Sequence, residues 1–153
     1  MQLWSKHVIA RSDDTVLTAE IMHAFAISIR TVPFTFSQVR PHRSRWEPAH
    51  YSREQILARL RELNGCEVAW PVEPLLRVPE AAALIRASGR QMAAGTLTHR
   101  RCTGRSVPSS IIISARGTTR YERAAVLAWI ASESRRYTPR RQRASYVATL
   151  RHL

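Results

Sequence analysis

Residues 76–88 have the sequence LRVPEAAALIRAS, and this stretch carries the start signals of a short helix. Pro79 falls near the first helical turn, where its missing amide proton removes no helical hydrogen bond. Glu80 stands where the helix dipole favours an acidic side chain. Apolar residues then recur at helical spacing through Ala83 and Leu84. We therefore predict a first helix over this stretch.

A second helix is expected over residues 96–104, which have the sequence TLTHRRCTG. It is expected to end at Gly104, because glycine readily takes the left-handed conformation found after many helices. Leu97 is expected to point inward, toward the first helix. Two helices joined in this way predict a small helical core.

A hairpin and a closing helix are expected next. Residues 111–113 are three isoleucines, and residues 118–121 form a second extended run. Residues 115–117, Ala-Arg-Gly, can turn between them, which is typical of two paired strands. Residues 122–136 then predict a final helix that closes the core. Its apolar side is expected to contain Val126, Leu127, Trp129 and Ile130.

In their order, these landmarks resemble the small winged helix-turn-helix of the MerR superfamily, in its excisionase and AlpA-like branch. The resemblance covers residues 75–136 and rests on VPEAAAL at 78–84, TLTHRRCTG at 96–104, RY at 120–121 and VLAW at 126–129. It implies a DNA-binding module whose second helix enters the major groove and whose hairpin is the wing.

The chain departs from that family at two places. Glu80 lies sixteen residues before Thr96, a longer interval than the family usually has. Residues 86–95 are therefore expected to form either a longer turn or an additional helical turn. Arg100 stands where the family commonly has an aromatic residue. Both departures bear on the tilt of the reading helix.

The first half of the chain repeats this plan. Glu20 and Tyr51 are 31 positions apart, against 41 for Glu80 and Tyr121, so insertions in loops account for the difference. Apolar residues stand five, six and nine positions after each tyrosine, and Ser28 is expected to cap the second helix of the first copy. We predict a mainly α fold with small β-wings: two tandem winged helix-turn-helix modules at 15–63 and 75–136, and a basic C-terminal tail at 137–153.

Positive charge is concentrated in the second half. Residues 76–153 contain fifteen arginines and three glutamates, a net charge of +12, whereas residues 1–75 have a net charge of +1. A localised basic surface favours nucleic acid as the partner, because neutralised phosphates release their counterions. The second module is therefore the predicted main reader of double-stranded DNA.

The candidate DNA-binding residues of the second module lie on its second helix, just after that helix, and on the wing. Side chains on the outward face of the helix can reach base edges or phosphates, and wing arginines can enter the minor groove or hold the backbone. Thr96 is expected either to cap the helix or to contact a phosphate. The set is Thr96, Thr98, His99, Arg100, Arg101, Arg105, Arg116, Thr118 and Arg120.

The first module is expected to bind differently. Pro33 follows the start of its second helix, which should be short, kinked or lost. Phe34 and Phe36 are interpreted as core residues. The basic stretch RPHRSRW at 40–46 is either a backbone-gripping or minor-groove arm or a solvated loop. Secondary DNA-binding candidates are Arg30, Arg40, His42, Arg43 and Arg45, with Arg140, Arg141 and Arg143 in the tail.

Catalysis, cofactors and metals are not expected. Asp13 and Asp14 are the only aspartates, and the six histidines have no metal-ligand spacing. Cys66 and Cys102 are interpreted as reduced thiols that are buried or incidental. No stretch approaches the roughly 18 to 20 apolar residues of a membrane span. We expect a cytoplasmic, nucleoid-associated protein with no membrane partner.

Several functions share this binding chemistry. The chain is predicted to be a DNA-binding protein of a phage or mobile element. It would act in DNA recombination as an excisionase, that is, a recombination directionality factor, or in transcription regulation. An integrase or a transcription protein, and self-association on DNA, are possible partners. The alternatives are an antiactivator-like protein-interaction module and a packaging-site binder like the terminase small subunit.

Overall fold

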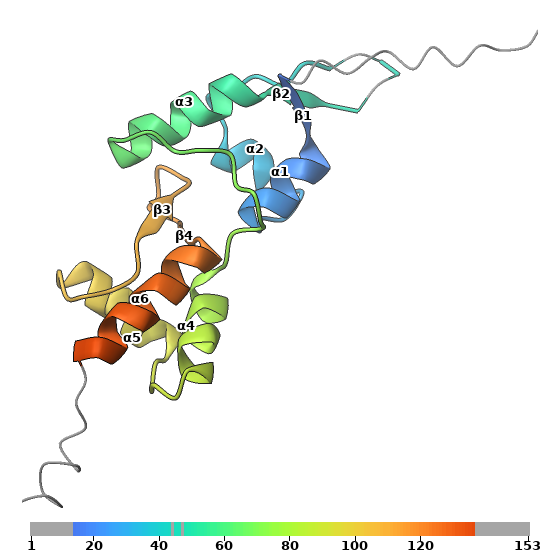
Figure 1. Ribbon diagram of the computed structural model, residues 1–153. Helices are drawn as coiled ribbons and strands as arrows, with labels where there is room; N and C mark the ends of the chain where they lie inside the picture. The colour runs from blue at the N-terminus through green and yellow to red at the C-terminus, as the bar shows by residue number, and fades with distance from the viewer. Residues whose placement is uncertain (1–13, 44, 47, 137–153) are drawn as a thin grey trace, which may run out of the picture. The chain divides into compact units, whose positions relative to one another are not determined.

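The computed structural model describes residues 14–43, 45–46 and 48–136, and within them the chain forms six helices and four short strands (Figure 1). The strands form two two-stranded sheets, one from β1 and β2 and one from β3 and β4. The fold is thus mainly helical with small β elements, as the sequence predicts. The predicted tail at 137–153, with Arg140, Arg141 and Arg143, lies outside the described residues.

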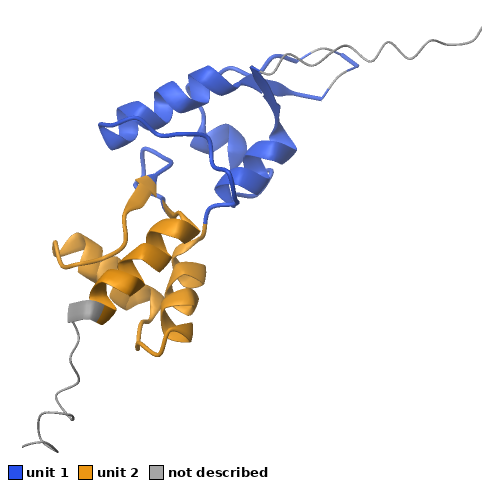
Figure 2. Ribbon diagram, in the orientation of Figure 1, with its two compact units in different colours: residues 1–75, 112–119 blue, residues 76–111, 120–153 orange. Residues whose placement is uncertain are grey.

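The chain divides into two compact units (Figure 2). Unit 1 consists of residues 1–75 and 112–119, and unit 2 of residues 76–111 and 120–153. The turn of the second hairpin is therefore counted with the first half of the chain. No described helix has the length and apolar character that crossing a bilayer would require.

Unit 1 begins with a strand that is followed directly by a helix. The elements in chain order are β1 (Thr15–Leu17), α1 (Thr18–Phe25), α2 (Val32–Thr35), β2 (His50–Ser52) and α3 (Arg53–Asn64). β1 pairs antiparallel with β2, and Val16 lies opposite Tyr51. The start of α1 is fixed by Glu20, whose carboxylate accepts the Leu17 N–H at 2.7 Å. This bond satisfies one of the amide protons that a helix start leaves without a helical partner.

The second helix of unit 1 is a single turn. Pro33 lies in its first positions, where proline is tolerated, and α2 ends at Thr35. This agrees with the predicted short second helix. The predicted cap, Ser28, is wrong, because the helix starts after Thr31. The Ser28 carbonyl instead accepts the N–H of Thr31 at 2.9 Å.

The two phenylalanines near α2 have opposite environments. Phe36 is 1% exposed and packs edge-on against Phe25, with 5.5 Å between ring centroids. Phe34 is 81% exposed, so our prediction that it is a core residue is wrong. The physical reason is spacing, because residues two positions apart on a helical turn do not face the same side.

Unit 1 also holds the turn of the second hairpin. The side-chain amide of Asn64, the last residue of α3, forms hydrogen bonds with the backbone of Ile112 as a neighbouring strand would. Its Nδ2 donates to the Ile112 carbonyl at 2.9 Å, and its Oδ1 accepts the Ile112 N–H at 2.8 Å. Ile113, the next residue in the chain, is fully buried. The Asn64 side chain therefore satisfies two backbone groups of the hairpin.

The second half of the chain contains three helices and a hairpin. Its elements are α4 (Val78–Ala87), α5 (Ala94–Cys102), β3 (Ser110–Ile112), β4 (Thr119–Tyr121) and α6 (Arg123–Arg136), and Ile112 and Thr119 at the strand ends are counted with unit 1. Leu76 forms an antiparallel bridge with Tyr121, with bonds of 2.8 and 2.9 Å, as Val16 does with Tyr51 in unit 1. Glu80 accepts the Arg77 N–H at 2.9 Å, as Glu20 does for Leu17.

Between α4 and α5 the chain forms a longer turn, residues 88–93, rather than an additional helical turn. α5 begins at Ala94, two residues earlier than the sequence predicts, and Ala93 precedes it. Thr96 therefore lies inside the first turn of α5 and is not its cap. Gly104, after the end of α5, has a φ of +67°, the left-handed conformation that was predicted there.

The core of unit 2 forms where α4, α5 and α6 meet β4. It contains Ala81, Ala82, Ile85, Met92, Leu97, Tyr121, Val126 and Trp129. Leu127 is 46% exposed and does not belong to it, which corrects the predicted apolar side of α6. Trp129 and Ile130 share a face with Val126 because they are three and four positions after it. Leu127 is the residue directly after Val126, and successive residues point about 100° apart around a helix.

Candidate nucleic-acid interface

α5 is held by one buried side chain and presents several polar ones. Leu97 is fully buried, while Thr98 and His99 are exposed. The Thr98 hydroxyl donates to the Ala94 carbonyl at 3.1 Å, which occupies its donor within the helix. The predicted inward position of Leu97 is confirmed, and Thr98 and His99 lie on the accessible part of the helix.

The basic residues of α5 cluster in its last turn. Arg100 and Arg101 are half-buried, and Arg105 after the helix is exposed. The Arg105 N–H donates to the Arg100 carbonyl at 2.9 Å, so the chain stays close to the helix end. Cations here also interact favourably with the helix dipole. Partial burial of these two side chains leaves them less rotational freedom to lose when they bind a ligand.

An open depression of about 700 Å³ lies at the start of α5. Thr96 lines it together with Arg86, Arg90 and residues of the preceding turn. Arg86 donates to the Met92 carbonyl at 2.7 Å, and Arg90 approaches Glu133 at 3.6 Å and lies over the Trp129 ring. Sequence reasoning missed both arginines, because nothing in their spacing places them beside Thr96.

The turn of the second hairpin is compact. The Gly117 N–H donates to the Ser114 carbonyl at 3.0 Å, and the Ser114 hydroxyl donates to that of Thr118 at 2.8 Å. Arg116 and Thr118 are both exposed. The structure therefore places both candidates at the surface of the turn, on the segment counted with unit 1.

Arg120, at the base of that hairpin, has a different environment. It is half-buried, and burial lowers the pKa of its guanidinium, with a further lowering by the neighbouring charge of Arg77. The carboxylate of Glu80 opposes these effects. Arg77 is exposed and was missed as a candidate, since 43 positions of sequence separate it from Arg120. Arg77 also pairs with Glu80, with 3.4 Å between Nη2 and Oε1, so this cluster contains two arginines and one glutamate.

The basic stretch of unit 1 forms a first hairpin, which an isolated bridge between His42 and His50 closes. Its two backbone hydrogen bonds measure 2.7 and 3.0 Å, and the two rings are 5.6 Å apart. The predicted residues Arg40, His42, Arg43 and Arg45 are all exposed. Arg30 is exposed too, but belongs to the turn before α2. Trp46, which was not selected from the sequence, is 85% exposed.

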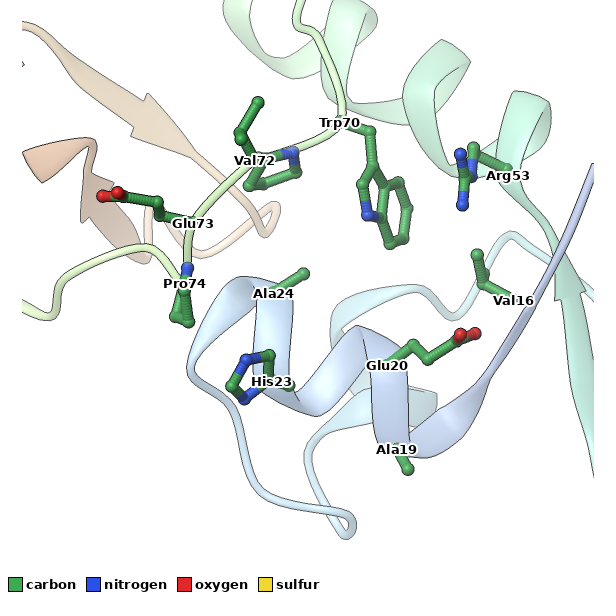
Figure 3. Close-up of a pocket in the computed structure, with 11 residues that line it drawn as sticks. Val16, Ala19, Glu20, His23, Ala24, Arg53, Trp70, Val72, Glu73 and Pro74 are labelled. Atoms are coloured by element: carbon green, nitrogen blue, oxygen red, sulfur yellow. The ribbon is translucent and has the colours of Figure 1, made fainter. Parts of the chain in front are cut away.

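A cavity of about 380 Å³ in unit 1 lies beside α1 (Figure 3). Trp70 stands over it, with its ring edge-on to Phe25 at 5.3 Å and the Arg53 guanidinium 5.0 Å from its centre. Glu20 and His23 also line it. The buried Nε of Arg53 has no hydrogen-bond partner among the described residues. Sequence reasoning did not indicate this cavity.

Candidate metal ligands do not gather in the described part of the chain, and the two cysteines are not paired. No three histidine, cysteine, aspartate or glutamate side chains within residues 14–43, 45–46 and 48–136 come together as metal ligands. Cys66 and Cys102 are free thiols, and both are exposed rather than buried.

Comparison with known proteins finds no matching family model, no matching curated protein and no matching solved structure.

Proposed function

We propose that this chain is a sequence-specific double-stranded DNA-binding protein built from two winged helix-turn-helix modules of the MerR-superfamily type, with unit 2 as the main reader. The observation that carries the proposal is the surface of α5. Buried Leu97 fixes the helix, while Thr98 and His99 are exposed and Arg101 follows in the same helix. Hydroxyl, imidazole and guanidinium groups are donors and acceptors suited to base edges and phosphates.

Charge supports the same partner. Among the described residues 76–136 there are eleven arginines and three glutamates, so the surface can neutralise several phosphates. Burial and the charge of Arg77 both lower the pKa of Arg120, against the effect of Glu80, and a phosphate bound beside Arg120 would favour its charged form.

The biological role that fits this chemistry is that of a phage or mobile-element protein. It acts either as an excisionase that cooperates with an integrase or as a transcriptional regulator, in the cytoplasm on the nucleoid. It has no catalytic role of its own. Directionality factors bend DNA and assemble in steps, so a large bend with stepwise complexes would favour the first role.

Salt-dependent binding tests the proposal. Duplex affinity of the full chain is measured by fluorescence anisotropy from low to high salt, for the wild type and for R100A/R101A. We expect the wild-type affinity to fall steeply with salt, and the double variant to lose at least about tenfold in affinity and about 2 in the logarithmic salt slope. The control R61A/R123A removes the same charge from exposed positions on α3 and α6. A wild-type affinity that does not change with salt would contradict the proposal.

A second function is favoured by one observation in unit 1. Ile29 and Phe34, beside and within α2, are 61% and 81% exposed, where unit 2 has its polar helix. Such side chains suit a protein-interaction module of the antiactivator type. In that case I29S/F34S would abolish binding to a purified integrase or transcription protein and R100A/R101A would not. The main proposal expects the reverse ranking for duplex DNA.

A further inference from the structure

Trp46 is the most exposed of the tryptophans in the described part of the chain. It is 85% exposed, whereas Trp70 is half-buried against Phe25 and Trp129 is 8% exposed in the core of unit 2. Tryptophan has the largest apolar surface of any side chain, and proteins usually bury most of it. Its exposure in a short hairpin therefore indicates a binding role.

The surroundings of Trp46 indicate what it binds. The Arg45 guanidinium lies 5.3 Å from its ring centre, Arg43 is exposed in the same hairpin, and Arg40 is exposed two positions before His42. An exposed aromatic ring beside several cations matches a nucleic acid, which has flat bases and an anionic backbone.

The base of the hairpin is well anchored. Two hydrogen bonds join His42 and His50, and Tyr51 is buried and paired with Val16 in the next ladder positions. These contacts anchor the two ends of the loop that carries Trp46.

The second hairpin shows what a wing without such a side chain looks like. Its turn is closed by bonds among Ser114, Gly117 and Thr118, and Arg116 is the one cation within residues 114–118. It can contact phosphates or enter a narrow groove, but it has no ring to place between bases. The first hairpin has both cations and a ring.

We propose that Trp46 is a wedge that enters the minor groove of duplex DNA and inserts between two base pairs, while Arg40, Arg43 and Arg45 hold the flanking phosphates. The inference rests on the proposed function and extends it to unit 1. Partial unstacking at the step kinks the duplex. Pyrimidine–purine steps such as TA unstack most easily, so the wedge also selects sequence there without base hydrogen bonds.

The test measures bending and unstacking with the full-length protein. Duplexes that contain the selected site, labelled at both ends, report the bend by energy transfer, and permanganate reactivity reports unstacked thymines. Variants W46A and W46F are compared with F34A, which removes an equally exposed aromatic ring of unit 1 outside the hairpin. We expect W46A to lose most of the bend and the reactivity, with an affinity loss of about five- to hundredfold. W46F should retain both in part.

The outcomes separate the wedge from the underlying function. If W46A bends the duplex and exposes thymines as the wild type does, the wedge is wrong although DNA binding stands. A loss confined to single-stranded oligonucleotides overturns it as well, because the ring would then stack on unpaired bases. If the wild type binds no duplex at any salt concentration, the proposed function and the wedge fail together. An equal loss in F34A would indicate a general effect of surface aromatics and would also overturn the wedge.

Discussion

The second helices of the two units, α2 and α5, each follow the first helix of their unit, and they differ in length and surface. Each follows a helix whose third residue, Glu20 or Glu80, accepts a backbone N–H before that helix. α5 has nine residues and exposes polar side chains, whereas α2 has four and exposes Phe34. Both still bury an anchor, Leu97 on α5 and Phe36 directly after α2. A buried apolar side chain at this place in a unit thus goes together with accessible surfaces of different chemistry.

The largest expected effects concern the two buried side chains that both units have in common, Phe36 and Leu97. Phe36→Ala should destabilise the protein by about 3–5 kcal/mol and Leu97→Ala by about 2–5 kcal/mol, because each leaves a cavity in a small core. Denaturant unfolding measures both. Phe34→Ala is the matched control and should stay within about 0.5 kcal/mol, since it is exposed. A large loss of stability for Phe34→Ala would mean that the Phe34 ring is buried rather than exposed.

The hairpin turn offers a second test, at Asn64. Asn64→Ala should cost about 1–3 kcal/mol, because two backbone groups of Ile112 lose their partners. Asn64→Asp keeps the shape but loses the donor to the Ile112 carbonyl, so it should be at least as destabilising at neutral pH. The free energy of unfolding of both variants checks this. An aspartate variant as stable as the wild type would show that the amide donor contributes little.

The smallest expected effect on stability concerns the buried tyrosines Tyr121 and Tyr51, and it depends on pH. Burial raises the pKa of Tyr121, and its hydroxyl has no hydrogen-bond partner among the described residues. Above the ordinary tyrosine pKa of about 10, the unfolded chain releases this proton while the folded protein retains it. Stability is therefore full below that pH and falls as the pH rises toward the folded pKa.

Tyr121→Phe should abolish this alkaline loss and raise stability at neutral pH by up to about 1 kcal/mol, since it removes an unsatisfied buried group. Thermal unfolding from pH 7 to 11 measures both effects. Tyr51→Phe, at the equivalent position of unit 1, is the comparison. Equal behaviour of the two variants would mean that burial of the Tyr121 hydroxyl has no special cost.

Sequence patterns predicted the local elements of unit 2 well. The helix signals at Pro79 and Glu80, the inward Leu97 and the left-handed Gly104 all depend on neighbouring residues, so periodicity and helix-end preferences suffice. Leu127 was misplaced because a run of apolar residues does not show which of them turns to solvent.

The candidate site was predictable only where it follows one element. The residues of α5 could be chosen from their helical positions, but Arg77 beside Arg120, and Arg86 beside Thr96, depend on tertiary packing. The bonds between Asn64 and Ile112 join residues 48 positions apart and have no periodic signature. Trp46 was noted as the end of the basic stretch 40–46 but was not chosen as a binding residue, because its sequence neighbours do not show whether it is buried.

The most direct test of the central claim, that α5 reads duplex sequence, is selection of bound DNA from a random duplex library by the full-length protein. The wild type should enrich a defined motif, R61A/R123A should enrich the same motif, and R100A/R101A should lose it. Recovery of the same motif by R100A/R101A, or of no motif by the wild type, would contradict it.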